Sequence, residues 1–348
     1  MQHLVSRRAL LARAAALPLA GLTAATGLAA LAACTRGEPG EGATPPPDPV
    51  TYLTNFGTLG RDAYAWVALD RGFFAEAGLD VTIQPGTGTN PNLTALLGGH
   101  AHFAAVDLAG AVIAAGNEVA GFSIIAAVQQ RNLSAIMTID PAITDPRDLE
   151  GRTVGLPPGA VTQLLFPVYA ELAGIDAGRV AQVALEAPEL VGALVAGRVD
   201  AIGQFVVGEP LVAAAADGRE VTVLPYDRYV GDLYGVTLLT STGLAEQDPD
   251  LCRRFRDALL RGLAYALDHP RDAGEVLARH VETADPEVAA AELTLMAPYA
   301  LGDSSTPLGG LDPARVARSI AILQAAGAVP SGLTPQRLVA FDLVPTRP

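Results

Sequence analysis

Apolar and polar residues alternate along the first part of the chain in the pattern of strands that are followed by helices. Four segments have the apolar character of strands: residues 50–53, 79–83, 103–106 and 122–128. Three segments between them have helical spacing: residues 62–69, which Asp62 can cap, 90–97 and 108–115. Strands that alternate with helices predict an α/β fold whose sheets are dominated by parallel strands and flanked by helices.

One short pattern occurs twice. Residues 95–103 (Ala-Leu-Leu-Gly-Gly-His-Ala-His-Phe) match residues 193–201 (Ala-Leu-Val-Ala-Gly-Arg-Val-Asp-Ala), and each copy reads as a helix end, a Gly stop and a strand start. A chance likeness in an Ala-rich chain is the alternative. Together with the strand–helix alternation on both sides, the repeat predicts two similar lobes.

The last third of the chain has a helical pattern only. Four amphipathic segments follow Leu239, and Asp precedes or opens each of them: residues 250–268, 272–281, 285–298 and 312–326. We expect this helical tail to pack back over the first lobe. The predicted boundaries are therefore residues 50–136 and 235–348 for lobe 1, and 137–234 for lobe 2. Cys252 fits a small core residue of the tail.

The first residues have the layout of a secretion signal. A basic start ends in Ser6-Arg7-Arg8, an apolar stretch follows, and Leu31-Ala32-Ala33-Cys34 has the form of a lipobox. We predict that residues 1–33 are a signal peptide and that Cys34 carries lipid. Ser6 to Leu11 resembles a twin-arginine signal, which exports folded proteins. A plain transmembrane anchor is the alternative, and the small residues before Cys34 disfavour it.

Residues 34–49 contain Gly, Pro, Glu and Thr without apolar periodicity, and they predict a flexible tether. The chain is thus expected outside the cytoplasm, in the periplasm or on the outer face of the cell membrane, attached only through its lipid.

Charge and composition exclude several classes of function. The chain has 37 acidic and 23 basic residues and a net charge of −14, which argues against nucleic acid and against a basic membrane-binding patch. All basic residues are Arg, so a lysine Schiff base or nucleophile is excluded. The histidines lack metal-ligand spacing, and no catalytic motif is present. We expect no enzyme activity, no cofactor and no metal, and a monomer.

Polar residues gather where predicted strands end. Examples are Asn55 after the first strand, Asp107 after the third and Gln204 after a strand of the second lobe. In open α/β sheets, ligands bind at the carboxyl ends of strands. Two lobes that face each other there form a cleft that can close on a small molecule.

Residues 64–81 carry the motif on which a family resemblance rests. They read Tyr-Ala-Trp-Val-Ala-Leu-Asp-Arg-Gly-Phe-Phe-Ala-Glu-Ala-Gly-Leu-Asp-Val and resemble the "A…GFF…GLDV" motif of periplasmic binding proteins. Residues 148–155 resemble the strand that opens the second lobe in such proteins, and residues 193–202 resemble their "AL…G.VDA" segment. The chain is similar to the family of binders of thiamine pyrimidine precursors, riboflavin, sulfonates and nitrate. His102 departs from it, because the family usually has Asp there.

The resemblance implies a type II periplasmic-binding-protein fold and a role as the solute-binding component of an ABC importer, with a membrane permease as its partner. It also implies a set of ligand-binding residues on the strand-end loops. From lobe 1 these are Asn55, Phe56, Asp62, Tyr64, Gly86, Thr87, Gly88, Asp107 and Gln129. From lobe 2 and the crossing back to lobe 1 they are Thr162, Gln204, Phe205, Glu209 and Tyr234. Asp62 and Thr162 are also explained as simple helix caps.

The charges of these residues favour one ligand class. Asp107 and Glu209 accept hydrogen bonds from ring N–H or amino groups, and Phe56, Phe205 or Tyr234 offers a ring for stacking. A thiamine-precursor pyrimidine or a related heterocycle is therefore the first choice. Sulfonates such as taurine, nitrate and riboflavin remain alternatives, because helix N-termini at residues 87–89 and 160–162 can bind oxyanions.

Two other classes of protein fit less well. Some relatives of the same fold are enzymes that make the thiamine pyrimidine with pyridoxal phosphate, but this chain has no Lys. A purely structural surface lipoprotein would leave the strand-end loops of the two lobes without a role.

Overall fold

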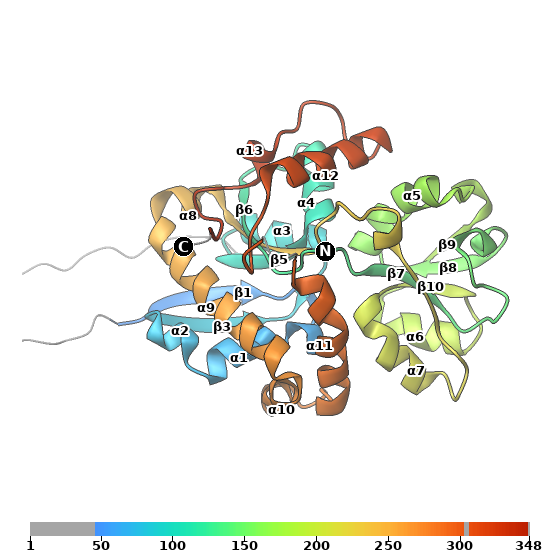
Figure 1. Ribbon diagram of the computed structural model, residues 1–348, viewed down its shortest axis with the longest axis horizontal. Helices are drawn as coiled ribbons and strands as arrows, with labels where there is room; N and C mark the ends of the chain where they lie inside the picture. The colour runs from blue at the N-terminus through green and yellow to red at the C-terminus, as the bar shows by residue number, and fades with distance from the viewer. Residues whose placement is uncertain (1–45, 303–305, 347–348) are drawn as a thin grey trace, which may run out of the picture. The chain divides into compact units, whose positions relative to one another are not determined.

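A computed structural model describes residues 46–302 and 306–346. Cys34, the predicted signal and all but the last residues of the tether lie outside these ranges. The described strands form two five-stranded sheets and one two-stranded sheet, and helices cover the larger sheets (Figure 1). We call the part built on the first large sheet lobe 1 and the part built on the second lobe 2.

Lobe 1 is built on a sheet with the strand order β3-β1-β5-β12-β6. Its strands are β1 (Asp48–Leu53), β3 (Leu79–Gln84), β5 (Phe103–Asp107), β6 (Phe122–Ala127) and β12 (Val236–Ser241). β1 pairs with β3 and β5 in parallel, whereas β12 pairs with β5 and β6 in the antiparallel sense. Its helices before the tail are α1 (Ala63–Asp70), α2 (Phe73–Glu76), α3 (Thr89–Leu97) and α4 (Leu108–Gly116).

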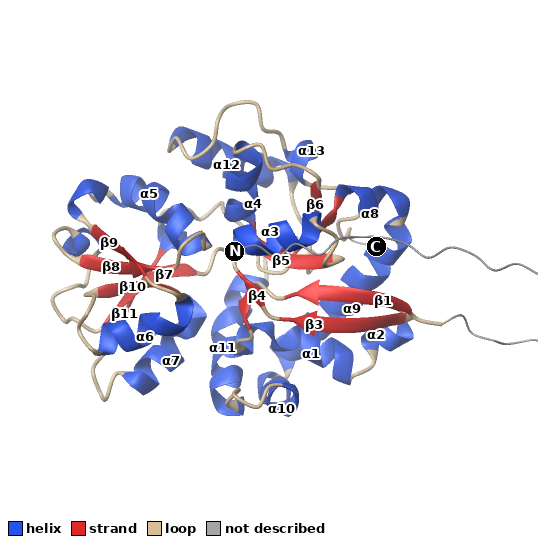
Figure 2. Ribbon diagram, turned by 180° about the vertical axis from the view of Figure 1, so that it is seen from behind, coloured by secondary structure: helices blue, strands red, loops and turns tan. Residues whose placement is uncertain are grey.

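Lobe 2 has the strand order β11-β7-β10-β8-β9. Its strands are β7 (Ser134–Thr138), β8 (Thr153–Leu156), β9 (Ala181–Ala184), β10 (Ala201–Phe205) and β11 (Thr222–Pro225). Figure 2 shows α5 (Val161–Ala173) on one face of this sheet and α6 (Ala187–Val195) with α7 (Glu209–Ala215) on the other. The predicted lobe boundary after residue 136 falls within β7, and β7 belongs wholly to the second sheet.

The prediction of a two-lobed α/β fold with a helical tail is confirmed, and in each five-stranded sheet four strands run in the same direction while one runs against them. β7 runs antiparallel to both of its neighbours, β10 and β11, as β12 does in lobe 1. These are the first strands after each crossing between the lobes. The chain enters each sheet there from the side of the other lobe, so the entering strand runs against its neighbours.

The tail packs on lobe 1, as predicted. It comprises α8 (Thr242–Gln247), α9 (Pro249–Asp268), α10 (Pro270–His280), α11 (Pro286–Ala300), α12 (Pro313–Ala325) and α13 (Pro335–Leu338). α9 and α10 contact α1 (Figure 1). The ring of Phe255 on α9 stacks on Phe103 of β5 with centroids 4.1 Å apart. Cys252 is buried in this interface and forms no disulfide, in agreement with its predicted core position.

Two further features of the tail concern its contacts beyond α1. α11 also contacts α7 and the 3-10 turn Val206–Gly208 of lobe 2, so it reaches both lobes. The tail also pairs with β6, because the N–H of Ala127 donates to Gly309 O at 2.9 Å and the N–H of Ala340 donates to Ile124 O at 3.0 Å. None of the helices in the described ranges combines the length and the apolar character that a bilayer span requires.

The two copies of the repeated pattern have the same local structure. α3 ends before Gly99 and α6 ends before Gly197, and both glycines have a positive φ of about 70°. In lobe 1 the N–H of Thr51 donates to Nδ1 of His102 at 3.0 Å. In lobe 2 the N–H of Thr153 donates to a carboxylate oxygen of Asp200 at 2.7 Å. His102 therefore performs the same strand-start role in lobe 1 as Asp200 does in lobe 2.

Candidate functional site

A cavity of about 750 Å³ lies between the two lobes. Its walls come from the loop after β1, from β4 (Gly86–Thr87), from the starts of α5 and α6, from the end of β10 and from α7. Several predicted site residues line this cavity: Phe56, Gly86, Thr87, Thr162, Gln204 and Phe205. The structure thus brings together predicted residues that lie far apart in the sequence, at the carboxyl ends of strands in both lobes.

Asn92 holds the lobe 1 wall of the cavity in place. The Asn92 amide nitrogen donates to the carbonyls of Thr54 (2.8 Å), Asn55 (3.2 Å) and Ala105 (3.1 Å), and its oxygen accepts from the N–H of Thr87 at 3.1 Å. This single buried amide therefore ties together the ends of β1 and β5 with β4. Asn92 was not among the predicted site residues.

The same packing explains why Gly is needed at position 86. A Cβ at Gly86 would lie 1.8 Å from the carbonyl oxygen of Thr54, which no real structure tolerates. The N–H of Gly86 also donates to Oγ1 of Thr54 at 3.0 Å. The close approach brings β4 directly against β2 (Phe56–Gly57), with which it forms a two-stranded sheet.

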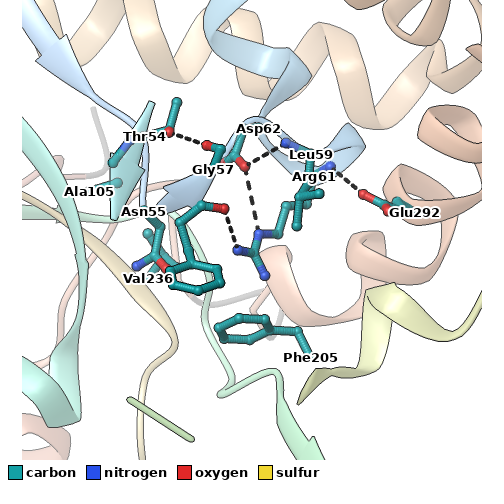
Figure 3. A network of polar contacts seen from close by, with 12 residues as sticks. Thr54, Asn55, Gly57, Leu59, Arg61, Asp62, Ala105, Phe205, Val236 and Glu292 are labelled. Carbon is teal, nitrogen blue, oxygen red and sulfur yellow. Dashed lines mark hydrogen bonds and ion pairs between the residues drawn. The ribbon is translucent and has the colours of Figure 1, made fainter. Parts of the chain in front are cut away.

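Two phenylalanine rings meet across the cleft. Phe56 of lobe 1 and Phe205 of lobe 2 have ring centroids 6.5 Å apart, within the usual range for an aromatic pair. The guanidinium carbon of Arg61 lies 4.0 Å from the centroid of the Phe205 ring, at cation–π distance. Figure 3 shows Arg61 extended toward Phe205 from the turn before α1.

Arg61 is only 1 % exposed and lies in a buried charge cluster. Its Nε is 3.7 Å from a carboxylate oxygen of Asp62, its backbone N–H donates to Glu292 of α11 at 3.2 Å, and one terminal nitrogen donates to Phe56 O (Figure 3). Nε itself has no hydrogen-bond partner among the described residues. Arg61 thus links the cavity wall and Asp62 through its guanidinium, and the tail through its backbone N–H.

Three buried carboxyl groups respond to this environment. Burial raises the pKa of Asp62 to about 6, and the pKa values of Asp107 and Glu292 to about 7, because the charged form loses its hydration. Arg61 acts in the opposite direction on all three. The side chain of Asp62 does not cap α1 but accepts the N–H of Leu59 at 3.3 Å, so the predicted helix-cap role is wrong in this detail.

Asp107 is placed differently from the ligand contact that we predicted. It begins α4, where it accepts the N–H of Ala109 at 3.1 Å, and both of its oxygens accept from the amide of Asn132 at 3.0 and 3.2 Å. Asn132 lies in the crossing to lobe 2, and its oxygen accepts the N–H of Ser134 at the start of β7 at 2.7 Å. Asp107 does not line the cavity and instead fixes the crossing between the lobes.

Three more predicted residues are buried with partners of their own and do not line the cavity. The hydroxyl of Tyr64 hydrogen-bonds that of Tyr52 at 2.9 Å. The side-chain oxygen of Gln129 accepts the N–H of Val236 at 3.1 Å. The hydroxyl of Tyr234 accepts the N–H of Asp312 at 2.9 Å, and Arg315 covers the Tyr234 ring.

The remaining predicted residues flank the cavity. Asn55 is buried, and its carbonyl accepts from Gly88, which has a φ of 109° and precedes α3. A Cβ at Gly88 would lie 4.0 Å from the Cα of Ala160, so the two lobes come close here. Glu209 is half-buried at the first position of α7, outside the cavity lining.

Thr162 differs from these residues, because its hydroxyl has no partner. The side chain is 1 % exposed, lines the cavity, and its Oγ1 makes no hydrogen bond within the described part of the chain. It is not the N-cap of α5, since Ala160 takes that position. A buried hydroxyl without a partner has a free-energy cost that a ligand can relieve.

Several residues of the site were missed by the sequence reasoning. They are Asn92, Asn132 and Glu292, which hold the walls, and Leu59, Pro157, Glu186, Pro188, Val191 and Leu211, which line the cavity. Glu292 had a visible signal, because it interrupts the buried face that Ala289, Leu293 and Met296 form on α11. No group of three or more His, Cys, Asp or Glu is arranged to hold a metal ion within the described ranges.

Comparison with known proteins agrees with this geometry. The family model described as "NMT1/THI5 like" matches residues 63–273. The formylaminopyrimidine-binding protein of Halalkalibacterium halodurans is 24 % identical over 254 residues, which are 72 % of this chain and 76 % of that protein. The riboflavin-binding protein RibY of Chloroflexus aurantiacus is 29 % identical over 155 residues, 42 % of this chain and 40 % of that protein.

Among solved structures, the periplasmic aliphatic sulphonate binding protein SsuA of Escherichia coli superimposes with a TM-score of 0.67 and 15 % identity, covering 85 % of this chain and 99 % of that one. This likeness establishes the periplasmic-binding-protein fold. The family model spans more than half of the chain and confirms the resemblance that the motif at residues 64–81 indicated. The chain belongs to the NMT1/THI5-like family.

Proposed function

We propose that this substrate-binding protein of the ABC-import type captures a small nitrogen heterocycle between its lobes and hands it to a membrane permease. The observation that carries the proposal is the cavity between the lobes, whose lining includes a phenylalanine from each lobe and Thr162, a residue with a hydroxyl that has no partner within the described residues. Aromatic rings suit a flat ligand, and a hydroxyl can donate to a ring nitrogen or accept from an amino group. The formylaminopyrimidine-binding relative supports the same class.

The electrostatics support a neutral or N–H-rich ligand over an anion. Arg61 is buried against the cavity wall, and its guanidinium already contacts Asp62, the carbonyl of Phe56 and the Phe205 ring. Glu186 is a carboxylate on the cavity wall. A sulfonate would meet no free guanidinium at the cavity, so it would depend on helix N-termini alone.

Calorimetric titration of the protein purified in detergent tests the ligand class. 4-Aminopyrimidine is expected to bind and an alkanesulfonate is not. Thr162→Val removes the hydroxyl at nearly constant volume and should weaken 4-aminopyrimidine binding by about two- to tenfold, the range of one neutral hydrogen bond. Thr222→Val, on β11 of the same lobe and away from the cavity, is the matched control. Sulfonate binding without aminopyrimidine binding would refute the proposed class.

We also propose that the protein is a lipoprotein attached to the outer side of the membrane through Cys34. The support is the order of basic residues, apolar stretch and Leu31-Ala32-Ala33-Cys34 in the sequence. Cys34→Ala should move the protein from the membrane fraction to the soluble fraction. A mutant that stays in the membrane after washing with high salt would contradict lipidation.

A further inference from the structure

The lobe 2 side of the cavity carries several apolar side chains. Pro157, Pro188, Val191 and Leu211 line the cavity together, and we call them the α6–α7 wall. Pro157 is buried and Val191 is half-buried, whereas Pro188 and Leu211 are exposed, Leu211 by 40 %. The wall belongs to the same cavity as Phe205 and Thr162, so a ligand held there is in reach of it.

The core of lobe 2 is formed mainly by other side chains. α6 packs through Leu190, Ala193 and Leu194, and α7 packs through Val212, against the sheet. Val191 lines the cavity and also packs against this core. Leu211 lies outside the core and is exposed, although the surface of a helix away from its buried face is normally polar. The apolar character of Leu211 therefore fits a role in the cavity.

The size of the cavity gives an independent indication. Its volume of about 750 Å³ lies in the upper part of the range of roughly 300–1,000 Å³ for pockets that enclose drug-sized ligands. A single ring with an amino group beside Thr162 would leave the α6–α7 wall in contact with water. Filling that space with apolar atoms is favourable in proportion to the area removed from water.

From the proposed function we infer that the ligand is a heterocycle with an apolar substituent, whose ring lies by Thr162 and Phe205 and whose substituent lies on the α6–α7 wall. The polar contacts then orient the ring, and the wall selects against ligands that lack the substituent. The competing explanation for the apolar α6–α7 wall is that Leu59 of lobe 1 packs on it when the lobes close, because Leu59 also lines the cavity.

The experiment compares two probes that differ only in the substituent, 4-aminopyrimidine and 5-butyl-4-aminopyrimidine, by calorimetric titration of the full chain in detergent. The butyl compound should bind roughly tenfold or more tightly, since each buried methylene contributes to affinity. Leu211→Asp should abolish this gain, so that the two probes bind this variant with equal affinity. Leu172→Asp, which alters a leucine that is 46 % exposed on α5 and lies outside the cavity, should preserve the gain.

Each other outcome has a definite meaning. Equal affinity of the two probes for the parent protein overturns the substituent subsite and leaves the proposed function intact. If Leu211→Asp weakens the binding of both probes by the same factor, the substituent subsite is overturned in favour of lobe closure. If neither probe binds the parent protein, the proposed function itself fails. Leu211→Ala, with folding checked by circular dichroism, replaces Leu211→Asp if the charged variant does not fold, and it should reduce the gain.

Discussion

Lobe 1 and lobe 2 approach the cavity with different kinds of side chain. Lobe 1 places Arg61 and Asp62 next to residues of its lining, and both are buried and engaged with other protein groups. Lobe 2 places Thr162 in the lining, with a hydroxyl that has no partner within the described residues, together with an apolar wall that is partly exposed. Both sets follow strands, so position at a strand end does not distinguish them. The two sets differ in whether their polar groups already have hydrogen-bond partners. A group with a partner stabilises the protein structure, whereas a group without one is available to a ligand.

The largest expected effect comes from removing the cation of lobe 1. Arg61→Leu leaves Asp62 and Glu292 buried without their counter-charge, so the free energy of unfolding should fall by about 3–5 kcal/mol. In lobe 2, Arg179→Leu breaks an ion pair with Glu150 whose Arg side chain is 64 % exposed, and it should cost less than about 1 kcal/mol. Urea unfolding measures both. If the free energy of unfolding falls by similar amounts in the two variants, the buried charge cluster stabilises the protein no more than an exposed ion pair does.

The second comparison uses pH. Burial raises the pKa of Glu292 from 4.5 to about 7, so the folded state holds this proton more tightly than the unfolded state. That contribution to stability is complete below about pH 4.5 and is lost as the pH rises through about 7. Glu292→Gln removes the dependence. The free energy of unfolding of Glu292→Gln, relative to that of the parent protein, should therefore rise by about 2 kcal/mol between about pH 5 and about pH 8.

For Asp148 of lobe 2, the pH dependence of stability should have the opposite sign. The N–H groups of Thr144 and Asp145 donate to its carboxylate and lower its pKa. This contribution is present above the pKa of the unfolded state and is lost as the pH falls, so Asp148→Asn should lose stability relative to the parent as the pH rises from the acid range. Urea unfolding across pH tests both signs. Parallel pH profiles for the two variants would contradict the difference between the lobes.

The smallest expected effect on the free energy of unfolding concerns the repeated pattern at residues 95–103 and 193–201. His102 and Asp200 each accept an N–H from a threonine on the neighbouring strand. His102→Asp keeps an acceptor there and should leave the free energy of unfolding within about 0.5 kcal/mol, whereas His102→Ala should cost about 1 kcal/mol. If His102→Asp is as damaging as His102→Ala, the two positions are not equivalent.

Periodicity and glycine positions predicted most of the fold. Of the six tail helices, α9 to α12 were predicted and begin within two residues of their predicted starts, and Asp285 and Asp312 cap α11 and α12 through side-chain hydrogen bonds. The direction of β7 and β12 was not predictable in this way, because alternation reports which face of a strand is buried and not which way the strand runs.

The site was predictable only in part, for a reason that Asp107 and Thr162 illustrate. Both follow strands, and both were expected at the ligand. Asp107 has a partner in Asn132, which sequence spacing cannot indicate because that contact depends on the path of the crossing between the lobes. Thr162 lacks a partner, and only the complete set of neighbours reveals that. The apolar wall was missed because a leucine at the start of a helix reads as core in a sequence.

The pairing of the tail with β6 has a consequence for self-association. β6 ends its sheet, and an uncovered edge strand presents free N–H and C=O groups that can add a strand from another molecule. Gly309 and Val339 occupy part of that edge. A chain shortened before Gly309 would keep both sheets and every cavity residue, yet it would expose β6 to its counterpart in a second copy. Because the C-terminal segment covers part of the β6 edge, we expect it to reduce edge-to-edge aggregation. Truncated variants made for crystallisation or display should therefore retain this segment.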